Sequence, residues 1–229
     1  GCAATKGPPR SSADDTTGAF IASFHAASRL HFIGAWRARA ETVLAAASAA
    51  ADAHTGSTPR FHPLPGAPRT VIHLDMDAFF AAVAVARCPA LAGAPLAVCH
   101  SNAAGGSGEV ACASYEARAS GVRAGWAISA AKAACPGLVV VPYDFPAYEA
   151  ASVGLYTALL SEATAVQPLS VDEAYIDATG HPDPAAWASR LRAQVQAATG
   201  GCPASAGVGP NPLLARLASE AAKPAGQAV

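Results

Sequence analysis

Two short acidic clusters, each embedded in apolar residues, constrain this chain more than any other feature of its sequence. The run VIHLDMD (71–77) predicts a buried strand that ends in Asp-Met-Asp. The run PLSVDEAYIDAT (168–179) predicts two short strands joined by a turn that carries Asp172 and Glu173. A carboxylate buried near a strand end is costly unless a cation or a hydrogen-bond donor compensates its charge. We therefore expect the two clusters to meet on neighbouring strands.

A pair of divalent cations would give such a cluster a function. Two Mg²⁺ ions roughly 3.5–4 Å apart can hold the attacking and leaving oxygens of a phosphoryl transfer in line. Mg²⁺ takes hard oxygen ligands and leaves coordination positions for substrate phosphates. Asp75, Asp172 and Glu173 are therefore candidate ligands. Either cluster alone would more often be a set of surface turn acids, and it is their joint apolar setting that favours a metal site.

A proline-dense segment divides the chain. Residues 54–70 contain four prolines, and prolines at that density cannot continue a helix. The predicted organisation is a flexible Pro/Gly/Ser-rich segment at 1–19, a helical extension at 20–53, a linker at 54–70 and one α/β unit at 71–229.

Within the α/β unit, short apolar runs alternate with helical patterns, which favours an α/β fold. Strands are predicted at 71–77, 94–100, 109–114, 138–143, twice within 168–179, and at 204–209. Helices are predicted at 78–86, 115–121, 127–135, 146–165, 183–199 and 212–222.

Composition weighs against a free-standing nucleic-acid binder. The 229 residues carry a formal net charge of −1. A domain that binds nucleic acid without the help of another domain is usually basic, because neutralising the phosphates supplies most of its affinity. The neutral balance fits a chain whose main nucleic-acid-binding domain lies elsewhere. The six cysteines form no CxxC pair and no Cys/His zinc spacing.

One local pattern is suited to phosphate binding. Tyr115 and Arg118 lie three residues apart and so share a face of the predicted helix. An arginine donates in a planar fork that matches triphosphate oxygens. By itself, an arginine on a short helix is more often a solvated charge. Lys223, at the end of a predicted helix, would by itself be a favourable cap of the helix dipole.

Five segments, taken in order, resemble the Y-family translesion DNA polymerases. They are HLDMDAFF, CASYEARASGVRAG, VPYDFPAYEA, LSVDEAYID and AGVGPNPLLARLASEAAKPAGQ, and they lie within residues 71–229. The resemblance implies a ferredoxin-like polymerase palm with small helical fingers, preceded by the N-terminal helical extension. It also implies a chain truncated before the thumb and little finger, which would follow Val229.

The resemblance assigns the catalytic metal site. Asp75, Asp172 and Glu173 match the catalytic, metal-binding carboxylates, and Met76 would add its backbone carbonyl to one metal. Two Mg²⁺ ions are the implied cofactors, with Mn²⁺ as a substitute.

The resemblance also implies the contacts of the incoming nucleotide. Phe80 matches the aromatic steric gate, whose ring occupies the space that a 2′-OH would need, and Phe79 would pack beside it. Cys112 stands where many relatives carry a hydroxyl, and a thiol is a weaker donor. The implied nucleotide-binding residues within the α/β unit are Phe79, Phe80, Cys112, Tyr115, Arg118 and Lys223.

The N-terminal segment FHAASRLHFIGAW (24–36) is similar to the extension of the deoxycytidyl transferase branch, the Rev-one type. In that branch an arginine pairs with the incoming nucleotide and the template guanine is displaced. Arg29 would be that arginine, and Leu30 would fill the vacated space. Cytosine presents adjacent acceptors at O2 and N3 to which a guanidinium can donate twice. By itself, SRLH would more often be a helix start with Ser28 as its cap.

The expected function is translesion DNA synthesis in which dCMP is transferred to a primer 3′ end opposite template guanine or an abasic site. The implied partners are primer–template DNA, dCTP and other translesion-synthesis proteins acting through regions outside this chain, with no membrane. A nuclear location follows from the family alone. Three alternatives stay open: a general Y-family polymerase, a non-catalytic fragment that binds DNA or partners, and a nucleotide cyclase, which also uses a two-metal ferredoxin-like palm.

Overall fold

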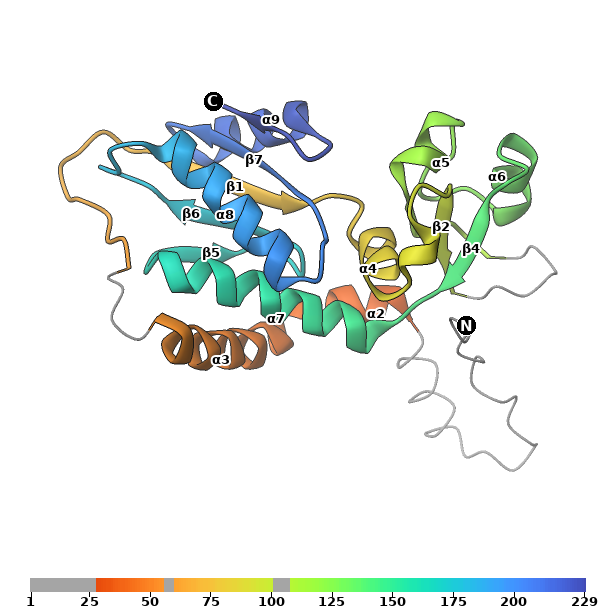
Figure 1. The fold of residues 1–229 in the computed structure, drawn as a ribbon, viewed down its shortest axis with the longest axis horizontal. Coiled ribbons are helices and arrows are strands. Elements are labelled where there is room, and N and C mark those ends of the chain that lie inside the picture. The colour runs from red at the N-terminus through yellow and green to blue at the C-terminus, as the bar shows by residue number, and fades with distance from the viewer. Residues whose placement is uncertain (1–27, 56–59, 101–107) are drawn as a thin grey trace.

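The computed structural model describes residues 28–55, 60–100 and 108–229. The predicted flexible segment 1–19 and the first part of the helical extension lie outside the described residues. The described chain forms two sheets, one of five strands in the order β5-β6-β1-β7-β8 and one of three strands in the order β3-β2-β4 (Figure 1). The α/β class expected from the sequence is confirmed.

The larger sheet is built around β1 (Val71–Met76). Strands β6 (Glu173–Asp177) and β7 (Ala204–Gly209) both run antiparallel to β1, one on each side. The outer strands are β5 (Val166–Pro168), antiparallel to β6, and β8 (Gln227–Ala228), parallel to β7. The sheet is therefore mixed, and its central strand is the one that carries the first acidic cluster.

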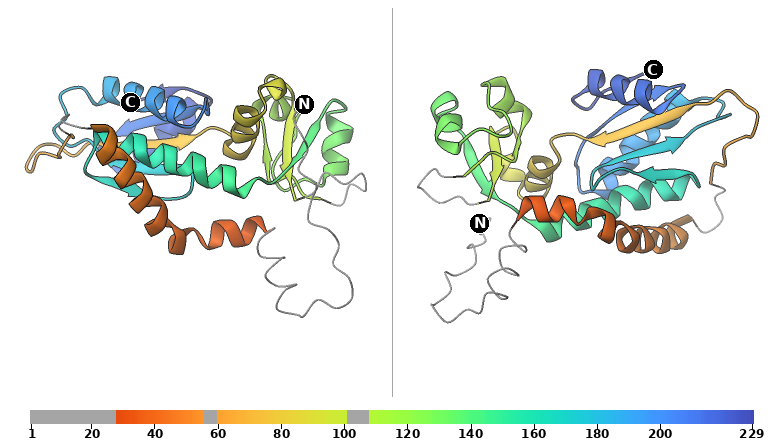
Figure 2. Two further views of the ribbon diagram at one scale, coloured as in Figure 1. Left: turned by 60° about the horizontal axis from the view of Figure 1, so that its bottom comes forward. Right: turned by 180° about the vertical axis from the view of Figure 1, so that it is seen from behind.

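Three long helices cover the two faces of this sheet. Helices α7 (Phe145–Glu162) and α8 (Pro184–Ala198) pack against each other, and α9 (Pro212–Ala222) lies on the opposite side of the sheet from α7 (Figures 1 and 2). Each begins with the same local chemistry: an Asp or Asn caps the first turn, and a proline stands in it. Both features favour a helix start, because the cap satisfies a free backbone N–H and proline lacks one.

A glycine lets α9 lie directly on β7. A Cβ at Gly207 would stand 2.0 Å from the backbone oxygen of Ala215 and 2.3 Å from the backbone nitrogen of Ser219. No side chain fits at that approach. The lack of a side chain at Gly207 therefore lets α9 lie close to the face of the sheet that carries the odd-numbered side chains of β1. The even-numbered Ile72, Leu74 and Met76 point to the other face and join the main core.

The smaller sheet and its helices form a separate body joined to the larger one through α4 (Phe79–Arg87) and the β4–α7 connection (Figure 1). It has its own buried cluster, which includes Ala97, Val110, Ile128 and Leu138. Its elements are η1 (Pro89–Leu91), β2 (Leu96–Cys99), β3 (Cys112–Ala113), α5 (Tyr115–Ala119), α6 (Ile128–Ala134) and β4 (Val139–Pro142).

Two N-terminal helices pack beneath α7, on the side away from the sheet (Figure 2). They are α2 (Arg29–Gly34) and α3 (Trp36–Thr55). The ring of Phe32 stacks on Phe145 with centroids 4.7 Å apart, and Trp36 stacks on Tyr156 at 6.0 Å. The helical extension is thus anchored on α7 by aromatic side chains.

The described part of the predicted linker, residues 60–70, is fastened to the larger unit. The backbone N–H of Phe61 donates to the carbonyl of Glu162 at 2.8 Å, and the Phe61 ring meets Trp187 edge-on at 5.0 Å. Its prolines prevent a helix, as expected, but the segment runs along the end of α7. Across the described ranges, none of the helices combines the length and apolarity needed to cross a bilayer.

Candidate active site

Strand pairing brings the two acidic clusters together. In the antiparallel register of β1 and β6, Asp75 lies directly opposite Glu173. The backbone N–H of Met76 donates to the carbonyl oxygen of Asp172 at 3.0 Å, which fixes the turn before β6 against the end of β1. The sequence-based prediction that these carboxylates meet on neighbouring strands is confirmed.

Each carboxylate has a protein partner. Lys223 Nζ lies 2.8 Å from Asp75 Oδ2. The Ser170 hydroxyl donates to Asp172 Oδ1 at 2.5 Å.

Glu173 has two partners on one oxygen. His73 Nε2 lies 2.7 Å from Glu173 Oε1, and an Arg216 terminal nitrogen lies 3.1 Å from the same oxygen. Across the described ranges, no group of three or more His, Cys, Asp or Glu side chains is arranged so that it could hold a metal ion without rearrangement. The carboxylates are close together but turned toward cations and donors of the protein itself.

Burial, hydrogen bonds and neighbouring charges shift the pKa values of these three carboxylates. Burial raises the pKa of Asp172 to about 6; the Ser170 hydrogen bond opposes the shift, and the charges of Asp75 and Glu173 add to it. The pKa of Asp75 is also raised by burial, against the effect of Lys223. The pKa of Glu173 is lowered, first by its hydrogen bond from His73. The cluster thus holds negative charge where little water can solvate it.

This donor set fits divalent cations. Its ligands are hard carboxylate oxygens, the kind that Mg²⁺ takes. A cation would offset both the burial and the neighbouring negative charges that raise the pKa of Asp172. The side chain of Met76 is 1% exposed and belongs to the main core, so only its backbone could face such a cation. Lys223 would have to leave Asp75 to expose that carboxylate.

A cavity of about 460 Å³ opens beside the acidic cluster. It gathers most of the residues that the sequence singled out, together with two from the N-terminal helices, Ile33 and Trp36. The predicted site residues that line it are Asp75, Met76, Phe79, Phe80, Cys112, Arg118, Asp172 and Lys223.

The two phenylalanines differ in their surroundings. The ring of Phe80 lies 4.4 Å from that of Tyr148, measured between centroids, and is 8% exposed. Phe79 is 4% exposed and contacts the same tyrosine at 5.9 Å. Cys112 lines the cavity with a thiol whose pKa is raised by burial, so it would act there as a neutral group.

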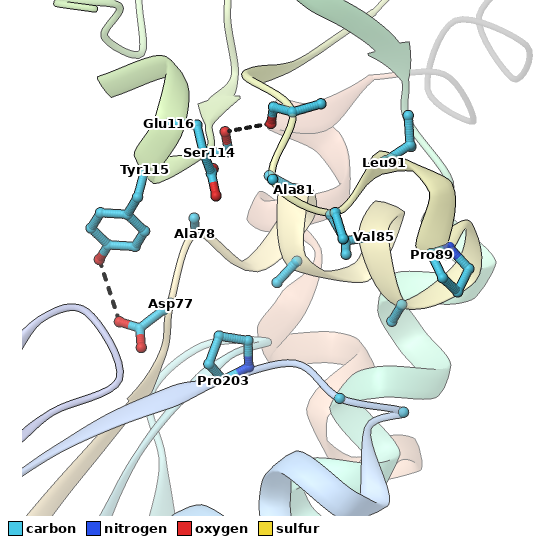
Figure 3. Close-up of a pocket in the computed structure, with 17 residues that line it drawn as sticks. Asp77, Ala78, Ala81, Val85, Pro89, Leu91, Ser114, Tyr115, Glu116 and Pro203 are labelled. Atoms are coloured by element: carbon cyan, nitrogen blue, oxygen red, sulfur yellow. Dashed lines mark hydrogen bonds between the residues drawn. The ribbon is translucent and has the colours of Figure 1, made fainter. Parts of the chain in front are cut away.

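Tyr115 does not line this cavity. Its hydroxyl donates to Asp77 Oδ1 at 3.4 Å, and both side chains face a second cavity of about 390 Å³ between α4 and α5 (Figure 3). Burial, with the Asp77 charge, raises the pKa of Tyr115 to about 12. Arg118, which lines the larger cavity, contacts Tyr115: its guanidinium lies 4.7 Å over the Tyr115 ring, and its Nε donates to the carbonyl of Ala113 at 2.9 Å.

Asp77 has a structural environment. It is 1% exposed and accepts hydrogen bonds from the Ser205 hydroxyl at 2.9 Å and from the backbone N–H of Ala225 at 2.7 Å. Arg29 and Leu30 form the first turn of α2, but their side chains lie outside what the structure describes. The same helix contributes Ile33 to the larger cavity.

Several residues at the site were missed from the sequence. His73, Ser170 and Arg216 contact the carboxylates directly, and Tyr156 donates to the carbonyls of Ser170 at 2.6 Å and Glu173 at 3.0 Å. A histidine two residues before Asp75 must share its face of the strand, and that alternation was a usable signal. The contact with Arg216 depends on long-range packing and had no local signal.

Comparison with known proteins gives one family and two groups of relatives. The model of the impB/mucB/samB family matches residues 74–220. The chain is 40% identical over 215 residues to "DNA repair protein REV1" of Arabidopsis thaliana, covering 91% of this chain and 19% of that protein. It is 43% identical over 166 residues to "DNA polymerase IV 3" of Mesorhizobium japonicum, covering 71% of this chain and 45% of that protein.

Among solved structures, a "Y-family DNA polymerase chimera" matches with a TM-score of 0.64 and 34% identity, covering 69% of this chain and 48% of that one. The chain therefore spans between about a fifth and a half of the length of these relatives.

Proposed function

Because the chain belongs to the impB/mucB/samB family, the Y-family DNA polymerases, we propose that it transfers a deoxynucleotide to a primer 3′ end on a DNA template. The observation that carries this function is the meeting of Asp75, Asp172 and Glu173 beside the 460 Å³ cavity. The relatives are much longer than this chain, so the substrates of the whole protein are also a proposal.

The reaction is a nucleotidyl transfer. The primer 3′ oxygen forms a bond to the α-phosphorus of the incoming triphosphate, the bond to the β-phosphate bridging oxygen breaks, and pyrophosphate leaves with the hydroxyl proton passing to solvent. Bound Mg²⁺ would supply the positive charge that stabilises the developing oxyanions. Asp75, Asp172, Glu173 and the backbone of Met76 are the groups that would hold it.

The cavity walls supply nucleotide contacts. Arg118 and Lys223 offer cationic donors for triphosphate oxygens. The Phe80 ring packs against Tyr148 and lines the cavity, which supports a role in which it lies against the sugar of the incoming nucleotide and excludes a 2′-OH. Tyr115 could join them only after its hydroxyl leaves Asp77.

Deoxycytidyl transfer is the finer function that we favour. The match to the REV1 relative covers 91% of the chain and so extends well before residue 71, whereas the polymerase IV match covers 71%. The region before residue 71 contains Arg29 and Leu30, which would replace the template base. The identities of the two relatives are similar, and this supports a second candidate: a polymerase that reads the template in the ordinary way.

Single-nucleotide primer extension with Mg²⁺ tests the catalytic function. Wild-type protein is compared with Asp172→Asn and with Asp183→Asn, which makes the same change at the exposed cap of α8, where Asn caps equally well. We expect extension by the wild type and by Asp183→Asn, and a loss of at least a hundredfold in Asp172→Asn. Equal rates in all three proteins would rule out this carboxylate site.

A further inference from the structure

His73 is the buried link between α9 and the acidic cluster. It lies on β1 and is 0% exposed. Its two ring nitrogens contact side chains from different elements: Nδ1 lies 2.5 Å from the Ser219 hydroxyl on α9, and Nε2 lies 2.7 Å from Glu173 Oε1 on β6. A single imidazole therefore spans the sheet and the helix that covers it.

The direction of the Glu173 contact follows from its chemistry. An ionised carboxylate only accepts hydrogen bonds, so Nε2 carries the hydrogen and donates it. The Ser219 hydroxyl either donates to Nδ1 or accepts from it while donating to the Arg216 carbonyl, 2.8 Å away. In both arrangements the ring is held from one side and donates from the other.

The arrangement has the order of a Ser-His-Glu triad, but it cannot act as one. Ser219 is 0% exposed, so its hydroxyl cannot reach a substrate. The close packing at Gly207 closes the same region. The role that remains for Ser219 and His73 is to orient the Glu173 carboxylate.

We infer that His73 is a positioning residue: held by Ser219, it fixes Glu173 Oε1 and so keeps the other carboxylate oxygen for a divalent cation. Arg216 reinforces this by contacting the same Oε1 at 3.1 Å. Groups that orient metal ligands in this way commonly change metal affinity by about 10–100-fold when they are removed. The inference rests on the proposed function and its metal site, and it adds a residue that determines the affinity of that site for divalent cations.

Two substitutions at His73 separate orientation from mere filling of space. The amide nitrogen of Gln occupies the place of Nε2, so His73→Gln keeps a donor for Glu173. The amide of Asn corresponds to Nδ1, so His73→Asn keeps the Ser219 contact and loses the donor. Ser219→Ala leaves the imidazole intact but frees it to rotate. As the control, Thr199→Val removes a different buried hydroxyl, at the C-terminal end of α8, which bonds to the Val195 carbonyl and not to the acidic cluster.

Mn²⁺ binding to the full chain is measured by titration calorimetry without DNA or nucleotide, alongside thermal unfolding in chelator to verify folding. We expect Mn²⁺ affinity to fall at least tenfold in His73→Asn, to stay within about threefold of wild type in His73→Gln, and to fall by an intermediate factor in Ser219→Ala. Thr199→Val should bind as the wild type does. Primer extension on the same proteins should show an increased Mg²⁺ requirement in His73→Asn.

The outcomes separate this inference from the proposed function. Wild-type affinity in His73→Asn, or equal losses in His73→Asn and His73→Gln, would overturn the positioning role even if the protein polymerises. Absence of Mn²⁺ binding by the wild type would overturn it as well. Graded Mn²⁺ affinities without any primer extension would support His73 and reject polymerase activity.

Discussion

The charged form of the Asp172 side chain lowers the free energy of unfolding of the protein, and this effect can be measured. Its pKa is about 6 in the folded protein against an ordinary value of 3.8. Because the folded pKa is raised, the neutral form is the one that folding favours: the carboxyl carries no electrostatic penalty below about pH 4, and the full penalty is present above about pH 6. Roughly two pKa units at 1.36 kcal/mol each correspond to about 3 kcal/mol.

Asp172→Asn removes this penalty while keeping the local hydrogen bond, because the Asn side-chain oxygen can still accept from Ser170. Without metal at pH 7, we expect the variant to be more stable by about 3 kcal/mol, which corresponds to roughly 6–12 °C in Tm for a chain of this size. Wild-type stability should fall from pH 4 to pH 6 relative to the variant, and the two curves should converge near pH 4.

Thermal and denaturant unfolding in chelator, from pH 4 to pH 8, make the comparison, with Asp183→Asn as the matched control. Adding Mg²⁺ should raise the wild-type Tm and leave Asp172→Asn nearly unchanged, because a ligand that binds only the folded state stabilises it. Equal Tm values at pH 7 and parallel pH profiles would refute the reasoning, since Asp172 would then be as well solvated in the folded protein as in the unfolded chain.

Two further substitutions test the sugar gate and the packing of α9. Phe80→Leu should weaken discrimination against ribonucleotides by at least about tenfold, because a smaller side chain leaves room for a 2′-OH; the ratio of dCTP to CTP incorporation measures it, and an unchanged ratio would exclude the gate. Gly207→Ala should destabilise the protein by more than about 2 kcal/mol, because its Cβ would overlap the Ala215 backbone, whereas Gly137→Ala meets nothing within 4 Å and should have little effect. Equal unfolding midpoints for the two glycine variants would show that α9 does not pack as described.

Helices and strands that are bounded by proline, glycine or capping residues were predictable from the sequence. Helix α9 and strand β7 have the bounds expected from the sequence, Pro212–Ala222 and Ala204–Gly209. The reason is local: a proline in the first turn and an Asn cap start the helix, and glycine ends the strand. The acidic turn was also predictable, because apolar residues flank Asp172 and Glu173 on both sides.

What escaped prediction depends on contacts between distant segments. The carboxylates were expected to meet, but the partners that hold them, such as Arg216 on α9, come from packing at Gly207 rather than from any periodic pattern. Tyr115 shares a short helix with Arg118 as expected. Its hydroxyl, however, donates to Asp77, and its side chain lines the smaller cavity and not the larger one. Strand β8 has only two residues and pairs through long-range register, so no local signal marked it.

Nucleotide choice in primer extension tests the central claim most directly. Wild-type protein and Arg29→Ala are offered each dNTP separately, with Mg²⁺, opposite each template base and an abasic site. We predict that the wild type inserts dCMP in preference to the other nucleotides opposite guanine and the abasic site. Because a bidentate contact discriminates by about 1–3 kcal/mol, Arg29→Ala should lose about 5- to 150-fold of that preference. Insertion that follows the template base equally in both proteins would contradict deoxycytidyl transfer, and insertion of no nucleotide would contradict polymerase function in this chain.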